Sequence, residues 1–508
     1  MLDSITRRHA FFVRASHYFF LVLYFECAIG SSGRWLDFGY ISLRMILFTG
    51  AFIFSLPMVL KSLKLLFQDR IILTNMVFFL YVVFNSVLGF IYQNNPGFVR
   101  SDLTGFLFIV VLPGLVCNFN TRVKIEMIIK TIVIGSTVLA VITLFLHYLS
   151  PLLNVDEIDN YLTSYDIGFM GILGQDIYRI FFRSSIFNSA SIFFLFYLFC
   201  FEQDKKKRLL YTAGIVLNSY AVLLCYTRAI WIGVFISLIV FLIMAKSHFK
   251  QMLKAFIQVV VGFSLLLSTS YAIYGNFGVV TQGIGRIYNS ANIIPDAKVT
   301  GSENQDIAKI SSEDIDQSSV QPKSEPSVSR PVEKNDVNDN NQVEKADETL
   351  TTDEQATDND KTSANGMSGS ENAQYKADIM RVESIKYSFE LFAQKPIFGQ
   401  GLGKNLDDLR KDGKTEFTYL DLLMKLGVVG MVIYVIPFVL LNVQYFKCRK
   451  QSTRQGKLLA DTSMAALSLV LIVSIFNPYV TNPLGLSIYC IAILVIIRLK
   501  TEQICESD

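Results

Sequence analysis

Aromatic residues are missing from one long stretch of the sequence, between Tyr288 and Tyr375. In that stretch acidic residues outnumber basic ones, and Ser, Asn, Asp, Glu, Gln and Thr dominate. Such a composition cannot bury enough apolar surface to offset the conformational entropy that is lost on ordering. We therefore expect residues of about 290–372 to form a disordered acidic insert. A folded acidic module is the alternative, and no helical or strand periodicity supports it.

Histidine and cysteine occur in no pattern that suggests a metal site or a disulfide framework. The chain has four histidines and seven cysteines, without a CxxC motif and without Cys/His metal spacing. Clustered ligands at short spacings are what structural and catalytic metal sites require. We expect no metal ion in this protein.

Apolar residues are abundant: 52% of the chain is hydrophobic and its mean hydropathy is +0.40, despite the polar insert. Many of these residues form continuous apolar stretches that are long enough to cross the hydrocarbon core of a bilayer. The first of them follows Arg7 and Arg8 and shows no small-residue cleavage site, so we interpret it as a span and not as a signal peptide. The predicted fold class is an all-α integral membrane protein with about twelve transmembrane helices. The expected spans are 10–30, 41–60, 71–92, 102–117, 125–149, 184–201, 209–226, 229–245, 253–274, 419–446, 461–476 and 483–499.

Lysine and arginine load every second loop, which the positive-inside rule assigns to the cytoplasm. Both termini are then cytoplasmic, and one large extracytoplasmic loop, 275–418, lies between the ninth and tenth spans. The expected domains are a first part of the bundle, 1–274, this loop, and a second part of the bundle, 419–508. Nothing in the charge pattern suggests binding to nucleic acid.

The large loop is predicted to end with an amphipathic helix at about 378–395. Its apolar positions recur at helical spacing, and Pro396 and Gly399 end the pattern. These positions are Ile379, Val382, Ile385, Phe389 and Phe392. Arg381 lies at the edge of this stripe. The glycines of Gly399–Gly403 favour a tight turn, with a phosphate cradle of backbone amides as the alternative.

Three arginines on the outer side are predicted to bind a substrate. Arg228 sits in a turn too short to leave the membrane, and the preceding span, 209–226, contains no Asp or Glu. A guanidinium at that depth needs an anionic partner or carbonyl groups, and its fork suits bidentate binding of phosphate. Arg183, Arg228 and Arg381 together therefore indicate an outward-facing site for a phosphorylated, membrane-borne substrate. Arg179 and Asn188 are supporting candidates.

Three motifs resemble those of the O-antigen polymerase and O-antigen ligase superfamily. Arg183-Ser-Ser-Ile-Phe187-Asn188-Ser-Ala is similar to the family's Arg…Phe-x-Asn-Pro-Asn element, and Thr227-Arg228-Ala-Ile-Trp231 to its Ser-Arg-x-x-Trp element. Arg381 with Phe392, Pro396 and the glycines resembles Arg…Leu-Phe…Pro-Leu-x-Gly-x-Gly. The likeness covers 179–274 and 375–430, and the first 150 residues match only in hydropathy.

The resemblance implies a multi-pass enzyme of the bacterial inner (plasma) membrane that transfers glycan from a polyprenyl (undecaprenyl) diphosphate carrier. A polymerase transfers it to another lipid-linked glycan and a ligase to lipid A core; the outer arginines would hold the diphosphate. The resemblance implies no metal, no nucleotide sugar and no cofactor. Its implied partners are undecaprenyl-diphosphate-linked oligosaccharide, membrane lipids, and a chain-length regulator and a flippase of the same pathway.

The sequence departs from the ligase pattern at one position. In ligases of this family, the start of the tenth span carries a motif similar to His-Asn-x-Tyr-Leu…Gly-x-x-Gly. The corresponding segment of this chain is Glu416-Phe-Thr-Tyr419-Leu. Glu416 is the predicted catalytic base and Tyr419 a supporting residue, with an exposed loop carboxylate as the alternative for Glu416. Asp166, Asp176 and the substrate's own groups are the next candidates for the base. We expect a polymerase; an O-antigen ligase and a transporter or flippase of lipid-linked sugars are the alternatives.

Overall fold

The computed structural model describes residues 2–31, 33, 41–174, 177–276, 278–282, 369–406 and 417–507. The chain divides into two units: Met1–Tyr288 with Ala377–Asp508, and Asn289–Lys376. Of the second unit only Gly369–Lys376 is described, as the first turns of a helix. Residues 290–368 of the predicted insert, Glu416 and Asp176 lie outside the described residues. All other described residues belong to the first unit.

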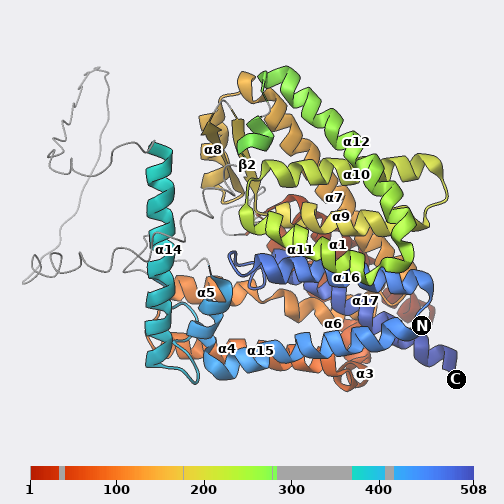
Figure 1. Ribbon diagram of the computed structural model, residues 1–508. Helices are drawn as coiled ribbons and strands as arrows, with labels where there is room; N and C mark the ends of the chain where they lie inside the picture. Colours follow the sequence, from red (N-terminus) through yellow and green to blue (C-terminus); the bar gives the residue numbers. More distant parts are fainter. Residues whose placement is uncertain are drawn as a thin grey trace, which may run out of the picture. The chain divides into compact units, whose positions relative to one another are not determined.

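Helices make up nearly all of this first unit (Figure 1). Those of the first half are α1 (Leu2–Ile29), α2 (Leu43–Lys61), α3 (Leu63–Gln68), α4 (Arg70–Ile91), α5 (Pro96–Gly105), α6 (Phe108–Asn118), α7 (Arg122–Leu149) and α8 (Val155–Ser164). The others are α9 (Ser185–Phe201), α10 (Lys205–Leu224), α11 (Arg228–Met244), α12 (Phe249–Tyr274), α14 (Gly369–Gln394), α15 (Thr418–Gln451), α16 (Arg454–Val473) and α17 (Pro483–Ser507). The described chain also has short 3-10 turns at Ser150–Leu152 and Lys246–His248.

Capping side chains set the starts of several helices. In each case a short polar side chain at the N-cap accepts a hydrogen bond from a backbone amide of the first turn, which would otherwise lack a partner. The capping residues are Ser42 for α2, Asp69 for α4, Thr121 for α7, Asp204 for α10 and Thr453 for α16.

The helices coincide with the apolar stretches of the sequence. Nine segments of the described chain are long and apolar enough to cross a membrane, among them Pro96–Asn118, which joins α5 and α6. Two shorter apolar helices, α9 and α11, coincide with the expected spans 184–201 and 229–245. The lysine-rich α10 overlaps the expected span 209–226. The protein is therefore a helical, multi-pass membrane protein, and the count of twelve crossings stays a prediction.

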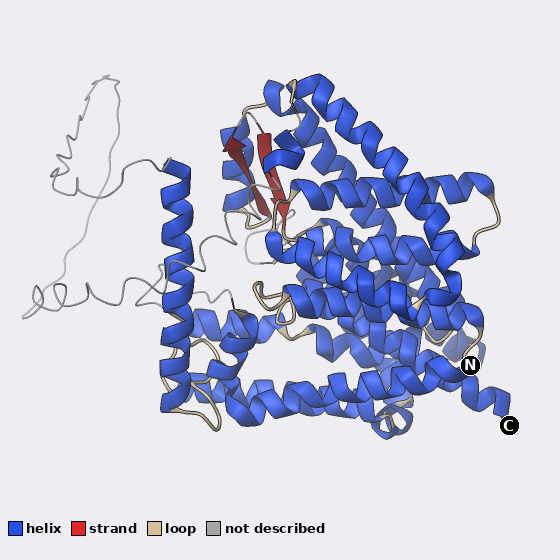
Figure 2. Cartoon of the chain, viewed as in Figure 1, coloured by secondary structure: helices blue, strands red, loops and turns tan. Residues whose placement is uncertain are grey.

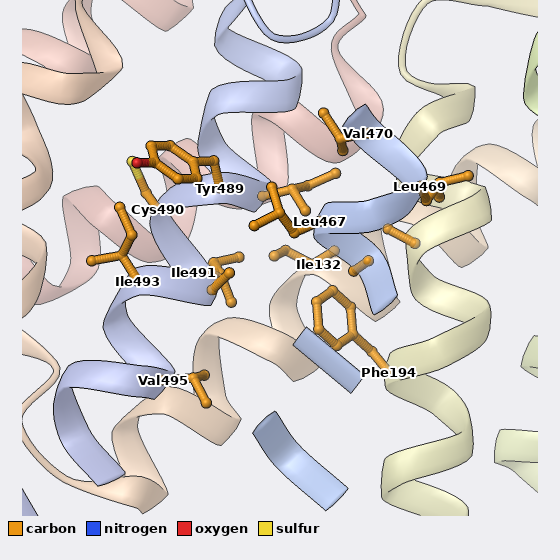
Figure 3. Packing of buried hydrophobic residues seen from close by; sticks show 14 of the residues in the cluster. Ile132, Phe194, Leu467, Leu469, Val470, Tyr489, Cys490, Ile491, Ile493 and Val495 are labelled. Atoms are coloured by element: carbon orange, nitrogen blue, oxygen red, sulfur yellow. The ribbon is translucent and has the colours of Figure 1, made fainter. Parts of the chain in front are cut away.

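The core of the bundle lies around α16 and α17. Almost every residue between Leu484 and Ile496 of α17 is buried, and α16 packs on α9, α11 and α17. Figure 3 shows side chains of α7, α9, α16 and α17 meeting there, with Ile132 and Phe194 facing Leu467. Because apolar side chains fill this region from all sides, the helices that surround it are fixed relative to one another.

A β-hairpin interrupts the otherwise helical chain between α8 and α9 (Figure 2). Its strands, β1 (Gly168–Gly174) and β2 (Ile177–Phe182), pair antiparallel. The all-α expectation did not include this hairpin. Alternating patterns over six or seven residues are easily hidden beside long apolar runs, so periodicity alone did not reveal it.

The helix expected at about 378–395 is α14, which begins earlier, at Gly369, and ends at Gln394. Its buried face carries Ser384, Ser388 and Leu391. The expected apolar stripe is not this buried face, since Val382 and Phe389 are exposed. Exposed apolar side chains such as these two are available to the bilayer.

Candidate functional site

The hairpin presents Arg179 on a defined face. Ile180 and Phe182 of β2 are buried in a small cluster with Leu139 of α7. Successive side chains of a strand point to opposite faces, so Arg179 projects away from that cluster. There its guanidinium carbon lies 4.3 Å from the centre of the Phe169 ring. This contact stacks the cation on an aromatic face and limits the orientations of Arg179.

Arg179 holds the turn that precedes Arg228. Its Nε donates to the carbonyl oxygen of Cys225 at 3.1 Å, and its Nη2 donates to Thr227 Oγ1 at 3.3 Å. Thr227 is the N-cap of α11, and its side chain makes no capping hydrogen bond there. Arg228 is the first residue of α11 and is half-buried. Arg228 and the supporting candidate Arg179 are therefore neighbours, and Arg179 positions the turn.

Arg183 lies where β2 leads into α9. Its amide donates to the carbonyl of Ile167 at 3.1 Å, which fixes the backbone. Its guanidinium forms an ion pair with Asp166, and these side chains are 37% and 39% exposed. A pair this exposed contributes little net stability, typically about 0–1 kcal/mol. An incoming dianion can therefore compete with Asp166 for Arg183 at small cost.

The α16–α17 loop, residues 474–482, joins Arg183 to the start of α15. Tyr479 donates its hydroxyl to the carbonyl of Arg183 at 3.1 Å. Thr418 donates its hydroxyl to the carbonyl of Asn477 at 2.8 Å, and the amide of Tyr479 donates to the same oxygen at 2.8 Å. Burial, and then the nearby Cys225 thiol, raises the pKa of Tyr479, while Arg183 opposes this shift. The phenol stays protonated and remains a donor.

Asn188 and Tyr419 contact neighbouring helices. Asn188 is buried in α9 and donates Nδ2 to the carbonyl of Ser136 in α7 at 3.3 Å. Its Oδ1 is buried and accepts no hydrogen bond within the described chain. Tyr419 donates its hydroxyl to the carbonyl of Leu471 in α16 at 2.8 Å. These contacts tie α9 and α15 to the bundle.

Arg381 lies on α14 and is half-buried. On an ideal helix Ser388 points within about 20° of it, so Arg381 shares the direction of the buried face. The C-terminal end of α14 is anchored through Leu391, which packs with Leu406 and with Met424 of α15. Gln400 Nε2 also donates to the carbonyl of Leu391 at 2.6 Å. The structure thus places Arg381 on an element that is fastened to α15.

The glycine-rich segment Gly399–Gly403 is a turn whose backbone amides are all used within the protein. The amides of Gly399, Gln400, Gly401 and Leu402 donate to main-chain carbonyls, in order those of Lys395, Met424, Lys425 and Asn85. The amide of Gly403 donates to Asp102 Oδ2 at 2.8 Å. No amide in this segment is left to cradle a phosphate, which favours the turn over the alternative.

Glycine is required in this turn for two physical reasons. Gly399, Gly401 and Gly403 have φ values of 77°, 79° and 81°, a region that other residues rarely adopt. A Cβ on Gly401 would also lie 2.6 Å from the amide nitrogen of Gly89. The loop therefore packs backbone to backbone on α4.

Helix α15 is broken at Gly427, which has φ 66° and ψ −174°. Tyr419, Gly427 and Gly430 would share one face only in a continuous helix, and this break ends that continuity. The freed amides of Val428 and Val429 donate to the carbonyls of Pro396 and Ile397, at 2.9 and 3.2 Å. Non-helical backbone at membrane depth is tolerated where protein groups satisfy it in this way.

Lys425 lies at this break and forms a buried ion cluster that the sequence reasoning missed. Its Nζ lies 2.9 Å from Asp102 Oδ2 of α5 and 2.9 Å from Asp421 Oδ2. The Lys425 side chain is 10% exposed. A lysine four residues after an aspartate within an apolar run was the available signal. Its partner Asp102, more than 300 residues earlier, is visible only in the structure.

Residues 213–435 match the family described as O-Antigen ligase. No curated protein matches the chain. The matched region begins within α10, contains α11, α12 and α14, and ends within α15, so it includes Arg228, Arg381 and the glycine turn. Arg179 and Arg183 precede it, and their hairpin lies against its first turn. This match supports the resemblance: over residues 213–435 the chain is similar to the O-antigen ligase family of polysaccharide-assembly membrane proteins.

Proposed function

We propose that this protein is a repeat-unit polymerase for a surface polysaccharide, such as O-antigen, capsule or exopolysaccharide. It transfers a glycan from a polyprenyl diphosphate carrier to another lipid-linked glycan on the outer face of the membrane. The observation that carries the proposal is that Arg183 and Arg228 lie at the same end of the helix bundle, part of which matches the family. Arg183 is paired with an exchangeable carboxylate there, and Arg228 begins a helix.

In this proposal the arginines bind the diphosphate of the donor. Arg228 stands at the N-terminus of α11, where the helix dipole also favours an anion. Arg183 exchanges Asp166 for a phosphate oxygen, and Arg381 of α14 contributes a third cation. Arginine suits this role because its planar fork binds two oxygens at once.

The transfer step is a displacement at the anomeric carbon. A base removes the proton of the acceptor hydroxyl, whose oxygen attacks the carbon and forms the new glycosidic bond. The bond from carbon to the phosphate oxygen breaks, and polyprenyl diphosphate leaves with the electron pair. The configuration inverts, and the arginines stabilise the charge that develops on the leaving group.

Glu416 favours the polymerase over the ligase, because it stands where the similar motif of ligases has a histidine. Glu416 is the base in this proposal. The described chain resumes at Phe417, and Thr418 is fastened to the loop that contacts Arg183. A carboxylate serves as a base near neutral pH when partial desolvation raises its pKa.

We expect Glu416→Gln to lower turnover by ~10²-fold or more while the lipid-linked substrate still binds. The change keeps the size of the side chain and removes its basicity. Turnover is measured with purified protein, and substrate binding separately with the same preparation. Lys414→Gln, two residues away, is the matched control and should leave turnover unchanged. Polymer formation at a near wild-type rate would show that Glu416 is not the base.

A transporter of lipid-linked sugars is the second candidate function. The break in α15 and the buried charges around Lys425 favour it, because transporters use broken helices and ionisable groups within the bilayer. Here, however, protein groups satisfy the broken backbone.

Purified protein given a lipid-linked oligosaccharide distinguishes these functions. A ladder of longer lipid-linked products supports the polymerase. A single product on added lipid A core would mean a ligase. Movement of substrate across a proteoliposome membrane without any product would mean a transporter.

A further inference from the structure

An apolar groove of about 310 Å³ opens between α11 and α12, at a distance from the arginine site. It arises because two consecutive helices pack on different partners: α11 on α16, and α12 on α10. Figure 1 shows α12 crossing the bundle apart from α11. The side chains that line it are apolar apart from one serine: Ile192, Phe193, Phe196, Ile215, Ser219, Val234, Leu238, Leu242, Phe249, Met252, Leu253, Phe256 and Val259.

The groove begins at the lysine-rich end of the bundle. Leu242 and Phe249 line it on either side of the short turn Lys246–His248. Phe249, Leu253 and Phe256 are each about half exposed, so the first turns of α12 leave an aromatic and aliphatic wall uncovered. Partway along the groove, α12 is joined to α10 by the hydrogen bond from Thr212 Oγ1 to Gln258 Oε1, at 3.2 Å. The groove is therefore open at its basic end.

Cationic side chains border this open end. Arg208 of α10 points within about 20° of Ile215 and Ser219, two lining residues of the same helix. Its guanidinium carbon lies 4.7 Å from the centre of the Phe199 ring. Lys246 is exposed in the connecting turn, and Lys250 is exposed next to Phe249.

A second arginine supports the same border. Arg454 of α16 donates Nε to His248 Nε2 at 3.0 Å. The neighbouring acids are used differently: Asp204 accepts from the amide of Lys206 as the N-cap of α10, and Glu202 accepts from the amides of Gln203 and Asp204. The border of the groove therefore keeps a positive charge.

We infer that this groove binds an anionic phospholipid of the adjoining leaflet, with an acyl chain between α11 and α12 and the phosphate at Arg208 and Lys246. The charge and the apolar lining fit a molecule that has both an anionic head and a hydrocarbon chain, and basic pockets between transmembrane helices recognise such head groups. The bound lipid fills the space between two helices that pack mainly on different partners.

The occupant is not the proposed diphosphate substrate. Arg183 precedes α9, whereas Arg208 follows the end of that helix. The 17 residues of α9 separate the two ends by about 25 Å. The lipid site and the arginine site therefore open toward opposite sides of the bundle.

Tryptophan reporters in the full-length protein test this inference. Leu242→Trp places a fluorophore at the open end of the groove, and Leu73→Trp places one on α4, at an exposed position near its basic end. The protein is reconstituted in phosphatidylcholine vesicles with increasing amounts of brominated phosphatidylglycerol, which quenches nearby tryptophan. We expect half-quenching at Leu242→Trp to need at least about 5-fold less brominated lipid than at Leu73→Trp. A 5-fold ratio corresponds to about 1 kcal/mol, the contribution expected of a single cation near the membrane surface.

Charge variants identify the head-group contacts. Arg208→Gln and Lys246→Gln should each raise the half-quenching concentration at Leu242→Trp roughly 5-fold. Lys206→Gln is the matched control, because Lys206 points about 180° away from Ile215 on the same helix. If Arg208→Gln does not fold, Lys246→Gln in the exposed turn gives the same test.

Three results would overturn the inference. Equal quenching at Leu242→Trp and Leu73→Trp would mean general lipid contact only. Equal quenching by brominated phosphatidylcholine would mean an apolar groove without head-group selection. Release of quenching by added undecaprenyl phosphate, but not by unlabelled phosphatidylglycerol, would mean that the groove holds the isoprenoid carrier.

Discussion

Replacing Arg228 by alanine is expected to lower turnover by about 10²–10³-fold, the loss typical of removing one group that stabilises charge in the transition state. Arg183→Ala and Arg381→Ala should have effects of similar size, since each cation is proposed to hold the same leaving group. Lysine at these positions should restore only part of the rate, because its ammonium cannot bind two phosphate oxygens in a fork. Product ladders from purified variants give the measurement.

Arg100→Ala is the matched control for these changes. Arg100 lies on α5, is exposed, and is expected on the same side of the membrane. Its removal should leave turnover within about two-fold of wild type, as single exposed charges contribute little. Full activity in Arg228→Ala would remove the central element of the proposed site. A loss of activity together with loss of folded protein would instead point to a structural role.

The second large effect concerns stability. Lys425→Met should destabilise the protein by about 3–5 kcal/mol, because it leaves the carboxylates of Asp102 and Asp421 close together without their cation. These two side chains are 25% and 18% exposed, so water relieves only part of that cost. The loop Gly399–Gly403 should loosen as well, since Asp102 also accepts from the amide of Gly403.

Thermal unfolding of the purified protein in detergent checks this expectation. Lys447→Met is the control, because Lys447 is an exposed residue of the same helix, α15, and its loss should be nearly neutral. The triple change of Lys425→Met, Asp102→Asn and Asp421→Asn should recover much of the stability, since no unpaired charge remains. If Lys425→Met unfolds at the wild-type temperature, the ion cluster does not hold α5 to α15.

The sequence alone was enough to recognise a helical membrane protein. Long apolar runs have few alternative structures in a bilayer, where each backbone group must be satisfied within a helix or a barrel. The motifs around Arg183, Arg228 and Arg381 were also visible, because each keeps its short spacing within one segment. They led to the superfamily that the match over 213–435 supports.

Other features were decided only by tertiary contacts. The hairpin that carries Arg179 follows a pattern too short to stand out, and its position depends on burial of Ile180 and Phe182 against α7. The apolar stripe of α14 did not predict which face of this helix is buried. Ser384 and Ser388 are buried, whereas Val382 of the stripe is exposed.

The break in α15 shows the physical reason most directly. A helix that loses internal hydrogen bonds at Gly427 is costly unless other groups replace them, and those groups come from Pro396 and Ile397, about 30 residues earlier. The pairing of Lys425 with Asp102 likewise joins residues more than 300 positions apart. Local pattern determined which segments enter the membrane and which arginines lie at their ends, whereas the neighbours of those arginines were decided by the packing of the whole bundle.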